Sequence, residues 1–209
     1  MKKVIKFFGV LSAVALVRLL PFNWIVGSSQ AYFSWSSIGA PVIASQCGLG
    51  WIICFLLSAK LWTVSSLAIY FLHKLPLFCS AQLFVRPNQY VAVFLPLVCM
   101  GLFIIHPIGQ GAWLYSLYWL IPVGLYIKSR NAVWARALMA SFVSHAVGSI
   151  VWLYSGNIPT KVWLALIPVV LCERLLIAGA IVVSDQVCFV ISRQFQQIYQ
   201  VYVSCYRER

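Results

Sequence analysis

Acidic residues are scarce in this sequence. Aspartate and glutamate together occur three times in 209 residues, whereas lysine and arginine occur fifteen times. All charged residues make up 9% of the chain, compared with about a quarter in soluble globular domains, and hydrophobic residues make up 63%. This composition excludes a soluble globular domain and predicts a single integral membrane domain over residues 1–209. A nucleotide-driven motor would therefore have to be a separate chain.

Motifs for catalysis, metal binding and disulfide formation are also missing. The seven cysteines include no CxxC pair and mostly lie in apolar segments, where cysteine behaves as a small hydrophobic residue. The sequence has no HExxH, no GxSxG and no pair of intramembrane aspartates. We therefore predict no catalytic residue, metal site or cofactor. The net charge of +12 is spread over the ends of apolar segments, which indicates membrane anchoring and argues against nucleic-acid binding.

Candidate membrane spans lie at 4–20, 36–57, 61–84, 90–105, 112–127, 132–154 and 162–184. Segment 61–84 is the weakest crossing, because His73, Lys74 and Pro76 divide it into two short apolar halves. Basic residues lie near both termini, at Lys2, Lys3, Lys6, Arg193, Arg207 and Arg209. Since basic residues favour the cytoplasmic side, both termini are predicted there, and this requires an even number of crossings. We therefore predict an all-α, polytopic transmembrane helix bundle of about six spans, with seven possible.

Two segments are predicted to lie outside the spans. Residues 21–35 are polar enough for an outer loop, which could act as a lid, and their aromatic side chains suit the membrane interface. Residues 193–209 are predicted to form a short cytoplasmic tail, an amphipathic helix that lies on the membrane surface or on a partner.

Glu173 and Arg174 are adjacent inside the apolar segment 162–184. An ionisable side chain near the middle of a span costs roughly 2.5–3.5 kcal/mol on insertion scales, so such residues face protein, water or a ligand rather than lipid. Neighbouring residues point about 100° apart on a helix, so both side chains cannot face the centre of one cavity. We favour Glu173 as the residue that faces a binding site, because it shares a helix face with Trp163 and Val170.

A second group of polar residues lies in segment 132–154. Helical spacing places four positions on one face: Ser141, His145, either Gly148 or Ser149, and Trp152. Such a face could bind a small heterocycle between an imidazole, hydroxyl groups and a flat aromatic ring. An equally good reading is that His145 bonds to a neighbouring helix while the small residues allow close packing.

The connection 155–161 is short, so the segments on either side of it are predicted to form an antiparallel hairpin. Counted from this connection, His145 and Glu173 lie at comparable depth. Glu173 could therefore pair with His145 or with Arg174, or accept hydrogen bonds from a ligand.

Several aromatic and ionisable residues elsewhere in the sequence could contribute to the same site. Tyr115, Tyr118 and Trp119 could form a wall of the pocket, or could anchor the chain at the membrane interface. His106 precedes Pro107 and reads first as part of a turn, with a gating or ligand role as the alternative. Asp185 ends the last span, where water or a basic residue is the expected partner.

The order of these features resembles the substrate-binding S components of energy-coupling factor vitamin transporters. The first span followed by RLLPFNWIVGSSQAYFSWSSIGAPVIASQCGLG is similar to their first helix, covering loop and second helix. Their first helix has small residues four positions apart that contact the T component, and Gly9 and Ala13 fit this spacing. The resemblance implies a ligand held near the outer leaflet, a T component and ATPases as partners, and the bacterial cytoplasmic (inner) membrane as the location.

The first functional hypothesis is a membrane substrate-capture protein for a small water-soluble micronutrient, such as a vitamin or another heterocycle. Trp152 and the tyrosines would stack on its ring, while His145 and Glu173 would bind its polar edge. The remaining predicted contacts are Ser141, Ser149, Tyr115, Trp119 and Arg174. Two alternatives are an intramembrane enzyme that uses His145 with Glu173 or Cys172, and a structural subunit of a larger membrane complex.

Overall fold

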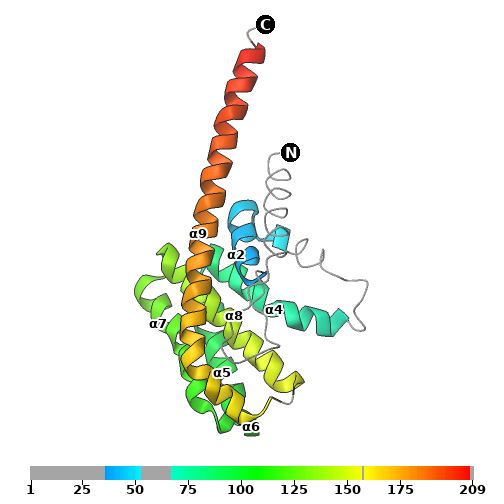
Figure 1. Cartoon of the computed structure of the whole chain (residues 1–209), viewed down its shortest axis with the longest axis vertical. Coiled ribbons are helices and arrows are strands. Elements are labelled where there is room, and N and C mark those ends of the chain that lie inside the picture. The colour runs from blue at the N-terminus through cyan, green and yellow to red at the C-terminus, as the bar shows by residue number, and fades with distance from the viewer. Residues whose placement is uncertain (1–35, 53–66, 157, 208–209) are drawn as a thin grey trace.

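The computed structural model describes residues 36–52, 67–156 and 158–207, and all regular elements within them are helices. In chain order these are α2 (Ser36–Cys47), α4 (Leu67–Val85), the π-helical turn η2 (Tyr90–Phe94), α5 (Leu95–Ile105), α6 (Pro107–Gln110), the 3-10 helix η3 (Trp113–Trp119), α7 (Leu120–Ser129), α8 (Val133–Ser155) and α9 (Thr160–Arg207) (Figure 1). The predicted all-α class is confirmed for these residues. The predicted span 4–20, with Gly9 and Ala13, and the loop 21–35 lie outside them.

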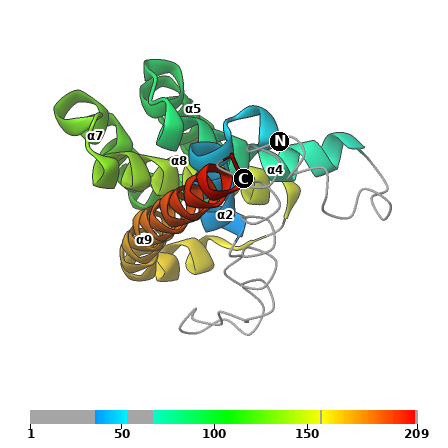
Figure 2. The same ribbon diagram turned by 90° about the horizontal axis from the view of Figure 1, so that it is seen from above.

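Helix α8 lies at the centre of the bundle. Most of its residues are buried, and it contacts α4, α5, α7, α9 and η3, with the most extensive contact to α4 (Figure 2). The helix is rich in alanine and serine, and such small residues let neighbouring helices approach closely. At Gly148 a β-carbon would already lie 3.8 Å from the Cγ of Pro76 in α4. The sequence of α8 therefore suits a helix that is covered on several sides.

Helix α4 covers most of the segment predicted as the weakest crossing. His73, Lys74 and Pro76 divide residues 61–84 into two short apolar halves, but α4 runs through all three positions without interruption. Proline removes one backbone donor and crowds the preceding turn, yet packing can outweigh this cost. Here Pro76 packs near Gly148 of α8, where a β-carbon would lie in ordinary van der Waals contact with the proline ring, at 3.8 Å from its Cγ.

The predicted span 112–127 is not a single α-helix. Its first part is η3, and a regular α-helix begins only at Leu120, as α7. The 3-10 helix rises about 2 Å per residue and has three residues per turn, so its side chains are distributed differently from those of an α-helix. In η3 this geometry buries Tyr115, Ser116 and Trp119 together. Two of the predicted wall residues thus lie in the core and do not anchor the surface.

The predicted hairpin is confirmed, because α8 and α9 are joined by a short connection and pack against each other. However, α9 does not end near Ser184. It continues for 48 residues to Arg207, about 72 Å at 1.5 Å per residue, and its last part extends beyond the other helices (Figure 1). After Gly179 the sequence contains no glycine or proline that would stop a helix. The predicted tail is helical, but it continues the preceding helix.

Two helices in the described part of the chain are long and apolar enough to cross a membrane. These are Val133–Ser155 and Thr160–Gln200, and shorter apolar helices cover Phe71–Val85 and Tyr90–Ile105. The long candidates are α8 and most of α9, so the hairpin that carries His145 and Glu173 contains both helices that are long and apolar enough to cross a membrane.

Gly48 ends α2 and interrupts the predicted span 36–57. Its φ of +101° lies in a region that residues with a side chain rarely adopt, and its N–H donates to the carbonyl oxygen of Ala44 at 2.9 Å. Glycine at this position is the common way to terminate a helix.

Replacing Gly48 with alanine is expected to destabilise the protein by about 1–2 kcal/mol, because a β-carbon disfavours the left-handed conformation. No other atom lies within 4 Å of the added β-carbon, so the effect would come from the backbone alone. Thermal unfolding of the purified protein in detergent measures it. Gly50→Ala is the matched control, since Gly50 also has free space but no positive φ, and an equal loss in both variants would contradict the explanation.

Candidate functional site

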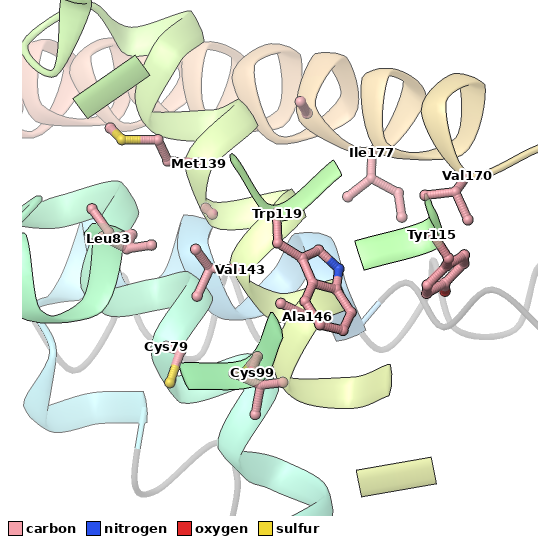
Figure 3. Packing of buried hydrophobic residues seen from close by; sticks show 14 of the residues in the cluster. Cys79, Leu83, Cys99, Tyr115, Trp119, Met139, Val143, Ala146, Val170 and Ile177 are labelled. Atoms are coloured by element: carbon pink, nitrogen blue, oxygen red, sulfur yellow. The ribbon is translucent and has the colours of Figure 1, made fainter. Parts of the chain in front are cut away.

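An aromatic cluster occupies the core between α5, η3 and the start of α9. It consists of Phe103, Tyr115, Trp119 and Trp163, all nearly or fully buried. The ring of Tyr115 stacks on Phe103 with centroids 5.5 Å apart, and Trp163 meets both rings edge-on at 5.1 and 5.3 Å. Figure 3 shows Tyr115 and Trp119 among the apolar side chains of this core. Such contacts fix ring orientations, so the cluster positions the Tyr115 hydroxyl.

The hydroxyl of Tyr115 is held between two polar residues of α8. It lies 2.7 Å from Nε2 of His145 and 3.2 Å from Oγ of Ser149. His145 and Ser149 are four residues apart and therefore occupy the same helix face. This contact confirms the predicted face for these two residues and places Tyr115 against it. The partner of His145 is thus a tyrosine from η3 and not Glu173.

Glu173 and Arg174 form an ion pair with each other. Arg174 Nη2 lies 2.8 Å from Glu173 Oε2, and the side chains are 10% and 11% exposed. Pairing between them was one of the predicted alternatives. Both residues lie within one helical turn of the buried Val170 and Ile177 and are almost equally covered, so the preference for Glu173 as the residue that faces a binding site stays a prediction. A carboxylate and a guanidinium can share a buried position only because each neutralises the other.

Ser141 connects the two helices at the level of this ion pair. Its hydroxyl donates to the carbonyl oxygen of Arg174 at 3.0 Å. The Arg174 guanidinium also interacts electrostatically with Tyr115 and His145. The polar side chains of η3, α8 and α9 therefore form one group, which we call the buried polar cluster: Tyr115, Ser141, His145, Ser149, Glu173 and Arg174.

Trp152 does not belong to the buried polar cluster. Its side chain is 56% exposed, and its ring meets His73 of α4 edge-on at 5.9 Å. Although Trp152 continues the helical spacing of Ser141 and His145, it lies close to the end of α8, and its side chain is exposed there. The predicted stacking role of Trp152 in this site is therefore not supported by the geometry.

The other candidate residues, His106, Cys172 and Asp185, lie outside the buried polar cluster. His106 forms the turn between α5 and α6, where its Nδ1 accepts from the backbone N–H of Ile108 at 3.3 Å. Cys172 is exposed, whereas the next two residues, Glu173 and Arg174, are largely covered. Asp185 accepts a hydrogen bond of 2.9 Å from the side-chain amide of Gln46, which ties α9 to α2. Within the described ranges, His, Cys, Asp and Glu side chains form no group able to hold a metal ion.

Sequence reasoning missed one residue of the aromatic cluster, Phe103, which stacks on Tyr115. Phe103 lies in a continuous apolar run and carries no polar signal. The sequence names Tyr118 as a possible wall residue but does not give its partner: the Tyr118 hydroxyl donates to the carbonyl oxygen of Ile167 at 2.8 Å, which fixes η3 against α9. No sequence pattern marks such a backbone acceptor.

Comparisons with protein-family models, characterised proteins and solved structures give no match. The site must therefore be interpreted from its own chemistry. It combines one ion pair, one imidazole, three hydroxyl groups and aromatic rings inside an apolar helix bundle. These groups can bind the polar edge and the face of a small ring, and they can bind each other.

Proposed function

We propose that this protein is a membrane substrate-capture protein for a small water-soluble micronutrient with a ring, such as a vitamin or a nucleobase-like compound. The observation that carries this proposal is the buried polar cluster, in which Tyr115, His145 and Ser149 lie beside the Glu173–Arg174 ion pair. Polar groups in an apolar helix bundle are costly to maintain, and ionisable residues in this setting usually mark a site of ligand or ion passage. A few converging polar groups with aromatic walls are also usual for small-molecule sites.

The distribution of basic residues supports a bundle of about six spans with both termini in the cytoplasm. The Arg136 guanidinium lies 5.6 Å above the ring of Phe84, so the end of α4, with Arg86, lies beside the start of α8. The connection from α7 to α8, with Lys128 and Arg130, is at this same end. These positions agree with a cytoplasmic face, and the protein would work there with an energy-coupling T component and ATPases in a bacterial inner membrane.

The function is tested by binding and uptake. The purified full chain in lipid nanodiscs would be titrated with riboflavin, thiamine, biotin, nicotinamide and uracil, and uptake of the labelled compounds would be compared between cells with and without the chain. Saturable binding together with chain-dependent uptake is the expected result. A product that forms from a lipid or peptide and disappears in His145→Ala would indicate an enzyme. No binding, with stoichiometric co-purification of a membrane partner, would indicate a structural subunit.

Tyr115→Phe is expected to weaken binding of the captured compound about tenfold, because the lost hydroxyl leaves His145 and Ser149 without their shared partner. Calorimetric titration in nanodiscs measures the change. Tyr118→Phe is the matched control, since it removes a hydroxyl from the same 3-10 helix whose partner is the backbone oxygen of Ile167. Equal losses of affinity in the two variants would mean that the effect is a general one on η3 and not specific to the polar cluster.

A further inference from the structure

The indole N–H of Trp119 is a buried donor without an acceptor. The side chain is 0% exposed, and its Nε1 has no hydrogen-bond partner in the part of the chain that the structure describes. Buried donors are nearly always paired, so one that is left over calls for an explanation such as a bound water or ligand. In Figure 3 the nitrogen lies on the edge of the ring turned toward Tyr115 and Ile177, which is the side of the buried polar cluster.

The hydrogen bonds inside the polar cluster show which kind of group is missing. The Tyr115 hydroxyl has one hydrogen and lies between His145 Nε2 and Ser149 Oγ, so it donates to one of them and accepts from the other. Ser141 donates to the backbone oxygen of Arg174. Tyr115, Ser141, His145 and Ser149 therefore each have a partner, whereas the Trp119 N–H has none among the described residues. A ligand that completes the site must therefore contain a hydrogen-bond acceptor.

The charge and shape of the site restrict the class of ligand further. Glu173 and Arg174 neutralise each other at 2.8 Å, so the site has no excess charge to balance that of an ion. The surroundings of Trp119 are flat rings, with Phe103 edge-on at 5.3 Å and Tyr115 at 6.1 Å. An uncharged planar compound suits both properties.

We propose that Trp119 is a ligand-binding residue whose indole N–H donates to a carbonyl oxygen on an uncharged planar ring. This role rests on the proposed function and names the substrate class: cyclic amides, imides, ureas and ring carboxamides. A site built to donate to a ligand oxygen strongly disfavours an analogue that lacks it, because the buried donor then stays unpaired. Trp119 would thus determine specificity.

The test uses pairs of compounds that differ at the carbonyl group. These are uracil and pyrimidine, and nicotinamide and pyridine. The full chain in nanodiscs is expected to bind the carbonyl compound of at least one pair about tenfold more tightly than its analogue. Trp119→Phe keeps an aromatic ring but removes the N–H, so it should bind both members of that pair with nearly equal affinity.

Trp163→Phe is the matched control, because Trp163 belongs to the same cluster but its N–H already donates to the carbonyl oxygen of Ile158 at 3.3 Å. This variant should keep the preference for the carbonyl compound. If Trp119→Phe keeps the preference as well, the proposed role of Trp119 is wrong while capture of a small ring stands. If the unmodified protein binds no compound of the wider panel, both proposals are wrong.

A second measurement detects the hydrogen bond of the Trp119 N–H directly in the unmodified protein. Protein labelled with ¹⁵N at the tryptophan indoles gives one N–H resonance for each side chain, and the Trp119 signal is assigned by its loss in Trp119→Phe. Adding the preferred carbonyl compound should move this resonance downfield, as expected when the N–H gains an acceptor. An unchanged Trp119 resonance at saturating ligand would overturn the assignment of this donor to the ligand.

Discussion

Arg174→Leu is expected to lose about 3–5 kcal/mol of stability, because it leaves the Glu173 carboxylate in an apolar bundle without its partner. The two side chains are only 10% and 11% exposed, so water can do little to replace the lost ion pair. The leucine itself would fit well, since it would lie on the face of α9 that carries Val170 and Ile177. Thermal unfolding in detergent micelles at neutral pH measures the effect.

The double variant Glu173→Gln with Arg174→Leu separates the lost charge pair from lost packing. It removes both charges, and replacing a complete buried ion pair is often close to neutral for stability. The double variant should therefore recover most of the stability that Arg174→Leu loses. If the double variant is as unstable as the single one, the guanidinium acts mainly through its other contacts and the explanation by an unpaired carboxylate is wrong.

Gly109→Ala is expected to destabilise the protein by about 2–4 kcal/mol, because the added methyl group overlaps the backbone carbonyl of Phe103. A backbone atom cannot move aside as a flexible side chain can, so the turn between α5 and α6 would have to open. Phe103 stacks on Tyr115, and the change would therefore also disturb the aromatic cluster. The unfolding temperature and the near-ultraviolet circular dichroism of the aromatic residues measure the two effects.

Gly124→Ala provides the comparison for this variant. Gly124 lies within α7, and nothing lies within 4 Å of the position of an added β-carbon. Alanine is favoured over glycine inside a helix by roughly 0.5–1 kcal/mol, so this substitution should be neutral or slightly stabilising. A loss of stability in Gly124→Ala similar to that in Gly109→Ala would contradict the explanation by overlap with the Phe103 carbonyl.

Several features of the fold were predictable because they depend on neighbours in sequence. The short connection between the last two predicted spans requires them to be adjacent and antiparallel, and α8 and α9 form this hairpin. The spacing of His145 and Ser149 places them on one helix face, where both meet Tyr115. Pairing of Glu173 with Arg174 was also among the alternatives, since they are consecutive residues that each need a partner in an apolar segment.

Other features were not predictable because they depend on packing between distant segments. The contact between Tyr115 and His145 joins residues 30 positions apart and relies on a 3-10 helix where a regular α-helix was expected. The burial of both Glu173 and Arg174 depends on the rotation of α9 about its axis, and this is set by α2, α8 and η3. Pro76 lies inside the continuous helix α4 and packs near Gly148, which belongs to a segment more than seventy residues away.

The sequence by itself determined that this chain forms apolar helices and that its few ionisable residues inside them need partners. Both conclusions follow from composition and local spacing, which act whatever the neighbours are. Only the tertiary structure decided that Tyr115, His145 and Ser149 share hydrogen bonds, that Trp152 lies outside the site, and that the Trp119 N–H is left without an acceptor. Helical periodicity states where a side chain points relative to its own helix, whereas the partner it meets depends on how the other helices pack around it.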